Sequence, residues 1–207
     1  MKKLLISALV ALATSGVAYA QSDFYLGVEG GFTFFSDTSD KVAKAYINEL
    51  GASTVEVEQE RVGALIRPFV GFELADDIAL ELGLSVQSRK TTAEGTFGGG
   101  TFKDTFKTSW RILDCSVLLH PNTSGFFARL GGHVTTIDTV FDRDGSGSVA
   151  DGSYSDTEHN SGLILGFGYD WKIGRGALRA SFTHYSNMLG YEDESLNLLK
   201  VGYLFKF

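Results

Sequence analysis

The sequence predicts an all-β chain, an eight-stranded antiparallel transmembrane β-barrel with short periplasmic turns and long external loops. Three observations support this fold class. Apolar side chains alternate with small or polar ones over most of the chain, which is typical of strands with two different faces. The connections between these segments alternate between long and short. Bulky apolar residues occupy one face of each segment, whereas Gly, Ser and a few charges occupy the other.

Residues 1–20 are expected to form a secretory signal peptide that is not part of the fold. Lys2 and Lys3 precede an apolar run from Leu4 to Ala13, and the stretch ends in Ala-Tyr-Ala. That run is shorter than the ~20 residues that a membrane-spanning helix needs. Cleavage leaves 21–207 as one barrel domain. It removes two of the 18 Lys and Arg, so 16 remain against 25 Asp and Glu, and the net charge becomes −9.

Composition excludes several classes of protein. The acidic balance argues against nucleic-acid binding. Cys115 is the one cysteine, so no disulfide can form within the chain. The mature sequence has no run of ~18 apolar residues, which excludes a helical membrane protein. Aromatic residues make up 13% of the chain, which argues against disorder. An exported β protein remains, either soluble or in a membrane.

The strands follow from the alternation, taken in chain order. The first places Phe24, Leu26 and Val28 on one face and Gly27 and Glu29 on the other. The same reading gives eight strands, at 23–35, 58–74, 78–92, 104–119, 126–141, 158–172, 177–188 and 195–207. Between the first two strands, the apolar residues of 40–50 follow the spacing of a short helix, which could cap the barrel mouth or decorate its surface.

The connections fall into two sizes. The short ones are Ala75–Asp77, His120–Gly125 and Ile173–Gly176, and the long ones are 36–57, 93–103, 142–157 and 189–194. Bacterial outer-membrane barrels have this rhythm, with short periplasmic turns and long outer loops. A soluble eight-stranded barrel could share the rhythm, but it would need its bulky apolar residues inside.

The distribution of side chains between the two faces favours the membrane. Lipid requires the bulky apolar face outside, which leaves a small, polar interior. Charges in such a narrow interior must pair, because burying an isolated charge is costly. This assignment predicts a lumen network of three acids and three arginines that closes the barrel: Glu29, Arg67, Glu81, Asp114, Arg129 and Arg179.

Several short motifs resemble the OmpA-like transmembrane β-barrel family. They include Phe24-Tyr25-Leu26-Gly27, Val70-Gly71-Phe72, Ala79-Leu80-Glu81-Leu82-Gly83, Phe127-Ala128-Arg129-Leu130-Gly131, Gly166-Phe167-Gly168-Tyr169-Asp170 and Leu178-Arg179-Ala180. The resemblance covers 23–207 and implies a closed or narrowly conducting barrel in the outer membrane of a Gram-negative bacterium. It also implies that the C-terminal aromatics Tyr203, Phe205 and Phe207 resemble the signal read by the barrel-assembly machinery.

One segment suggests an enzyme as an alternative. His184, Ser186 and Asn187, followed by Glu194, resemble the active-site segment of PagL-type lipid A deacylases. That resemblance implies His184 as general base, Ser186 as nucleophile and Glu194 as the group that orients the imidazole. Residues two apart share a strand face, so His184 and Ser186 would face lipid near the outer rim. OmpA-like barrels carry a similar Thr-x-Tyr-x-Asn segment at this strand end.

Metal sites are a second possibility. The stretch that begins at Asp142 matches a calcium loop at several positions, with Asp142, Asp144 and Ser146 as candidate ligands, but Ser153 replaces the bidentate Glu. The alternative is an acidic external loop. The four histidines lie in different predicted elements and show no metal-ligand spacing. No cofactor is predicted.

The sequence thus predicts a monomeric outer-membrane barrel with a structural or weakly pore-forming role. Its expected partners are membrane lipid and lipopolysaccharide, with the barrel-assembly machinery during biogenesis and no nucleic acid. The deacylase is one alternative. The other is an adhesin-type barrel that acts through the outer loops at 36–57 and 142–157.

Overall fold

The structure is a computed structural model that describes residues 24–35, 37–121, 125–188 and 195–207. The predicted signal peptide lies outside the described residues. The elements within these ranges are β1 (Phe24–Phe34), α2 (Ser39–Asn48), β2 (Thr54–Gln59), β3 (Val62–Ala75), β4 (Ile78–Phe97), β5 (Gly100–Leu119), β6 (Phe126–Ser146), β7 (Gly152–Ile173), β8 (Gly176–Tyr185) and β9 (Leu196–Lys206).

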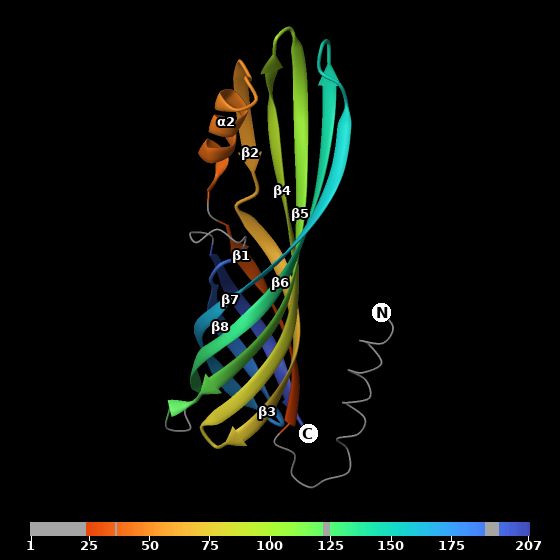
Figure 1. Cartoon of the computed structure of the whole chain (residues 1–207). Helices are drawn as coiled ribbons and strands as arrows, with labels where there is room; N and C mark the ends of the chain where they lie inside the picture. The colour runs from red at the N-terminus through yellow and green to blue at the C-terminus, as the bar shows by residue number, and fades with distance from the viewer. Residues whose placement is uncertain (1–23, 36, 122–124, 189–194) are drawn as a thin grey trace.

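The strands close into an antiparallel barrel, which confirms the predicted fold class. Its ring runs β1–β3–β4–β5–β6–β7–β8–β9, and β9 pairs back onto β1. Two of the predicted short turns join β3 to β4 and β7 to β8 at one end, and β5 ends and β6 begins at the same end, with 122–124 of the third predicted turn outside the described residues (Figure 1). We call this the periplasmic end and the opposite one the outer end.

The second predicted strand, 58–74, is split in two. β3 pairs with β1 on one side and with the lower part of β4 on the other, as far as Leu65 opposite Gln87. β2 instead pairs with the outer part of β4, from Gln59 opposite Thr91. The break falls where β1 ends, because beyond Phe34 there is no longer a neighbour that would keep β3 in the ring.

Two predicted loops are strands instead. The segments 93–103 and 142–157 continue the β4–β5 and β6–β7 ladders to turns near Gly98–Gly99 and Gly147. Those three glycines have positive φ angles, a conformation that glycine adopts without strain. Both segments lie in water and are polar on at least one face. The difference in polarity between the two faces, which identifies the membrane strands in the sequence, is therefore weaker there.

These extensions form an external sheet beyond the barrel, which we call the outer sheet. It consists of β2 and residues 88–97, 100–109, 136–146 and 152–161 of β4 to β7, and it rises on one side of the barrel (Figure 1). The predicted helix at 40–50 is present as α2, which packs on this sheet. Tyr46 and Phe102 are buried there, with their rings stacked at 5.2 Å.

The outside of the barrel carries an apolar belt, as the face assignment predicts. Its side chains are exposed although they are large and hydrophobic, which suits contact with lipid. Representative members are Val28, Ile66, Leu82, Leu84, Leu113, Leu130, Val134, Leu163, Leu165, Phe167, Leu199, Val201, Tyr203, Phe205 and Phe207. No helix within the described ranges is long and apolar enough to cross a membrane.

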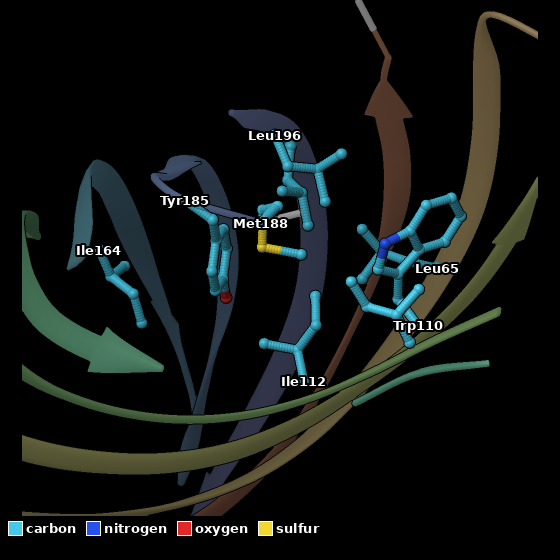
Figure 2. Packing of buried hydrophobic residues seen from close by; sticks show 9 residues of the cluster. Leu65, Trp110, Ile112, Ile164, Tyr185, Met188 and Leu196 are labelled. Carbon is cyan, nitrogen blue, oxygen red and sulfur yellow. The ribbon is translucent and has the colours of Figure 1, made fainter. Parts of the chain in front are cut away.

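The lumen is less polar than expected. A charged layer lies between two apolar clusters. One includes Tyr25, Phe69, Leu118, Phe127 and Leu204 towards the periplasmic end. The other fills the outer half of the barrel with Leu65, Trp110, Ile112, Ile137, Ile164, Tyr185, Met188, Leu196 and Leu198 (Figure 2). The prediction of a small, polar interior is therefore wrong for both ends of the lumen, because bulky inward side chains fill an eight-stranded barrel.

Candidate functional site

All six predicted charges meet in the middle of the lumen. The guanidinium of Arg67 lies 2.8 Å from Glu29 Oε2 and donates two hydrogen bonds to Asp114, of 2.8 and 2.5 Å. Arg129 Nη2 donates to Glu81 Oε2 at 2.5 Å, and Arg179 donates to Glu81 Oε1. These six side chains have almost no solvent exposure. The structure therefore brings together the whole set that the alternation of inward and outward side chains predicts.

Two further charges belong to this layer. Lys200 is fully buried, and its Nζ lies 3.2 Å from Glu29 Oε2. Asp170 accepts two hydrogen bonds of 2.7 Å from Arg179. Both residues lie on the inward face of their strands, opposite to the face that carries the apolar belt. The alternation that predicts the other six charges could therefore have predicted these two as well. With these two, four cations face four carboxylates in the described lumen.

Neutral side chains complete the charged layer. Tyr25 donates to Glu81 at 3.0 Å, and Ser181 donates to Glu29 at 3.0 Å. Within the described part of the chain, Arg129 Nε and Nη1 and Lys200 Nζ have no hydrogen-bond partner. Arg129 Nη1 and Lys200 Nζ are still held by ion pairs to Glu29, at 3.9 and 3.2 Å. Paired charges thus close the layer. They do not form a continuous chain of hydrogen-bonded groups through the lumen.

Residues 186–188, which directly follow β8, help to close the outer mouth. Met188 is 3% exposed and enters the outer apolar cluster (Figure 2). His133 Nε2 lies 2.9 Å from the Ser186 carbonyl oxygen, and its Nδ1 lies 2.9 Å from Thr135 Oγ1. Asn187 has a positive φ of 54° and donates to the Ser161 carbonyl at 2.9 Å. Sequence reasoning missed this seal, because its residues come from two separate strands, β6 and β7, and from the segment that follows β8.

Two of the three deacylase candidates, His184 and Ser186, lie within the described residues. His184 Nδ1 is hydrogen-bonded to Asn197 Oδ1 at 2.9 Å. The Ser186 hydroxyl accepts a 3.0 Å hydrogen bond from the Leu163 amide and lies 3.4 Å from the Leu163 carbonyl. His184 and Ser186 are thus each bonded to a group outside the proposed triad. Glu194 lies outside the described residues.

The calcium candidates lie in a strand. Asp142, Asp144 and Ser146 occupy alternate positions near the outer end of β6, paired with Thr105, Lys103 and Thr101 of β5. An extended backbone does not wrap three side chains around one ion, as a calcium loop must. In the part of the chain that the structure describes, no three His, Cys, Asp or Glu side chains are placed to hold a metal ion.

A hydrogen bond from Tyr46 to a half-buried ion pair of the outer sheet, Asp104–Arg143, holds α2 in place. Asp104 accepts two hydrogen bonds from Arg143, of 2.7 and 2.5 Å, and is also the acceptor for the Tyr46 hydroxyl. The hydrogen bonds to Asp104 raise the pKa of the Arg143 guanidinium, and burial raises the pKa of the Tyr46 hydroxyl. Arg143 also lies over the Phe102 and Phe141 rings, at 5.7 and 5.5 Å.

One edge of the outer sheet is open. Gly152 to Asn160 of β7 pair with β6, whereas β8 joins β7 only from Ile164 onward. Tyr154 is 56% exposed on the inner face of this edge, beside Phe141 at 4.9 Å. Within the described ranges no other strand covers these backbone groups.

A family comparison settles what the barrel is related to. The profile of the OmpA-like transmembrane domain matches residues 19–197, most of the chain. The chain belongs to the OmpA-like transmembrane domain family. This OmpA-like barrel is accordingly an outer-membrane protein of Gram-negative bacteria. Comparison with curated proteins gave no match.

Solved barrels are similar to this OmpA-like barrel at low sequence identity. The attachment invasion locus protein Ail of Yersinia pestis, in complex with the heparin analogue sucrose octasulfate, is 12% identical, with 89% of this chain and 99% of that chain covered and a TM-score of 0.43. Neisserial surface protein A is 16% identical, with coverage of 91% and 100% and a TM-score of 0.40. OprG of Pseudomonas aeruginosa is 12% identical, with coverage of 91% and 99% and a TM-score of 0.42.

Proposed function

We propose that this OmpA-like barrel is a closed membrane anchor that presents the outer sheet to another protein at the cell surface. The observation that carries the proposal is the length of β4 to β7. Each has 20 to 22 residues, whereas ~9–11 suffice to cross the membrane. The excess forms a sheet with its own buried cluster around Tyr46 and Phe102.

The filled lumen supports an anchoring role over a pore. An ion would have to pass the outer apolar cluster, the paired charges and the periplasmic apolar cluster. Desolvating it in that low-dielectric interior is costly. The structural role predicted from the sequence and the adhesin-type alternative are therefore combined: the barrel anchors and the outer sheet binds.

The open edge of β7 is the part of the outer sheet best suited to binding. Edge strands that leave N–H and C=O groups unpaired can take up an extended segment of a partner as an additional strand. Asp156 and Glu158 lie on the same face as Tyr154. They favour a partner strand with basic side chains at alternate positions.

A trimmed barrel tests this function. Gln87 lies opposite Trp110, and Thr135 lies opposite Asn160. Replacing 88–109 and 136–159 each by Asn-Gly, a two-residue hairpin turn, and 37–59 by a short Gly-Ser linker removes the outer sheet except for Asn160 and Ser161 but keeps the register of the barrel.

The assay is panning of a random peptide library against the wild type in lipid nanodiscs, with the trimmed barrel as counter-target. We expect enriched peptides that bind the wild type and not the trimmed barrel. Peptides that bind both equally, or no enrichment at all, would contradict the proposal.

A further inference from the structure

The lipid-facing surface of β5 to β8 contains a groove of about 430 Å³. It lies within the apolar belt and is not part of the lumen. Its volume falls within the ~300–1,000 Å³ of ligand pockets. Ala128 and Gly166 are its small residues, and larger side chains surround Ala128. The residues that matter for the argument are Leu119, Ala128, Leu130, Phe167, Phe182 and His184.

The groove runs obliquely through the belt. Leu119, Ala128, Phe167 and Phe182 are consecutive partners across four neighbouring strands. Leu119 is the last residue of β5, at the periplasmic end, and His184 lies one residue before the outer end of β8. Three strand spacings of ~4.8 Å make the groove roughly 14 Å long. That is the scale of one hydrocarbon chain.

The two ends of the groove differ in polarity. Its outer end carries His184, whereas Leu119, Ala128 and Phe167 towards the other end are apolar. His184 Nδ1 lies 2.9 Å from Asn197 Oδ1. An amide oxygen only accepts, so in the neutral imidazole Nδ1 carries the proton and Nε2 is left as an acceptor.

We propose that this groove binds one acyl chain of lipid A from the outer leaflet, with His184 at the junction between chain and head group. The apolar stretch from Phe182 to Leu119 would hold the chain. His184 Nε2 would accept a hydrogen bond from a hydroxyl or amide N–H near that junction, groups that the amide-linked hydroxyacyl chains of lipid A carry. The polar end faces outward, which assigns the lipid to the outer leaflet and therefore to lipopolysaccharide.

This proposal concerns binding without hydrolysis, and it is independent of the partner proposed for the outer sheet. The Ser186 hydroxyl is hydrogen-bonded to the Leu163 backbone and is not among the residues that line the groove. A bound chain would therefore meet an imidazole acceptor but no activated nucleophile.

The test is native mass spectrometry of the purified full chain in detergent, titrated with hexa-acyl lipid A. Ala128→Leu fills the groove, and Ala64→Leu makes the same change at an exposed position of β3 on another part of the belt. We expect the wild type and Ala64→Leu to bind one lipid A each. Ala128→Leu should bind roughly tenfold more weakly, because it removes close contacts along the chain.

Two further arms decide the chemistry. His184→Phe keeps an aromatic ring but removes the acceptor, so lipid A binding should weaken while Ser186→Ala binds as the wild type does. Phosphatidylethanolamine should bind more weakly than lipid A to the wild type. Equal binding of lipid A by the wild type and Ala128→Leu overturns the groove. Equal binding of the two lipids, or no effect of His184→Phe, overturns the assignment to lipid A.

Discussion

Arg67 contacts three carboxylates, those of Glu29, Glu81 and Asp114, and its side chain has no solvent exposure. Removing one partner of a buried ion pair leaves the other charge uncompensated, which costs more than the pair itself contributes. Buried charges of this kind are weak evidence for stability, but once in place they make the barrel dependent on each member.

Arg67→Ala should lower the free energy of unfolding by about 3–5 kcal/mol, because it leaves buried carboxylates without a cation. Urea-induced unfolding in lipid vesicles measures the change. Arg61→Ala is the matched control, since Arg61 pairs with Asp37 on the surface and should leave the stability unchanged within error. Equal effects of the two substitutions would show that the lumen network is not coupled to folding.

Asp138 on the outer sheet offers a residue-scale test in water. Hydrogen bonding from Thr157, with a further contribution from Arg111, lowers the pKa of this carboxyl. The ionised form is therefore the one that the fold favours. Its contribution is present above the ordinary pKa of an aspartate and is lost as the pH falls through the lowered value.

Thr157→Val should raise the pKa of Asp138 towards its ordinary value. Carboxyl-detected NMR titration of protein in nanodiscs measures it, with Ser155→Val, on the same face of β7, as control. An unchanged pKa in Thr157→Val would rule out the hydroxyl as the main cause.

The lumen charges illustrate what can be read from a sequence at this scale. Strand parity placed Glu29 and Arg179 inward correctly, because a β-strand alternates without exception unless a bulge intervenes. The contacts of His133 with Ser186 and of Tyr46 with Asp104 could not be predicted. They depend on how distant strands and α2 approach one another, which a pattern along one strand does not encode.

At the scale of elements, α2 depends on the side chains beneath it. It has no basic residue in its last turn and no side-chain cap at its N-terminus, so little in its own sequence stabilises it. Tyr46 and the Asp104–Arg143 pair hold it against the outer sheet. Docking and helix formation are therefore expected to be coupled.

Asp104→Asn should loosen α2, because it weakens the hydrogen bonds to Arg143 and Tyr46 and removes the countercharge. Hydrogen exchange followed by mass spectrometry should show faster exchange in 39–48 and no change in β8 and β9. Lys103→Gln, on the opposite face of the same strand, is the control. Unchanged exchange in 39–48 would mean that the apolar contacts alone hold the helix.

The strand boundaries show where prediction from sequence failed. All eight ring strands and the three short turns could be found, because lipid on one side and a lumen on the other sharpen the alternation. The extensions of β4 to β7 lie in water, where both faces tolerate Thr, Ser, Lys and Asp. Segments such as 142–146 therefore resemble loops in composition although they are paired in a ladder.

At the scale of the whole molecule, the stacked layers of the lumen predict an impermeable barrel. Single-channel recording in planar bilayers should show no steady conductance for the wild type. Met188→Gly should stay closed as well, since the charged layer and the periplasmic cluster remain below it. A large, steady conductance of the wild type would refute the closed lumen.

The deacylase alternative is also decided on the whole molecule. Lipid A extracted from cells that express the wild type should have the same acyl chains as lipid A from cells that express Ser186→Ala. Mass spectrometry of lipid A makes the comparison. Loss of one acyl chain with the wild type alone would establish an enzyme and overturn the anchoring role.

The unbroken ladders of β4 to β7 have a mechanical consequence. The same hydrogen-bonded strands run from the tip of the outer sheet to the periplasmic turns, with no hinge between sheet and barrel. A pull on a partner held at the tip would be transmitted along the strand axes. It would load many hydrogen bonds in shear at once, instead of opening them one after another. Tension on the cell surface would therefore reach the membrane-spanning part of the protein as a force on the whole barrel.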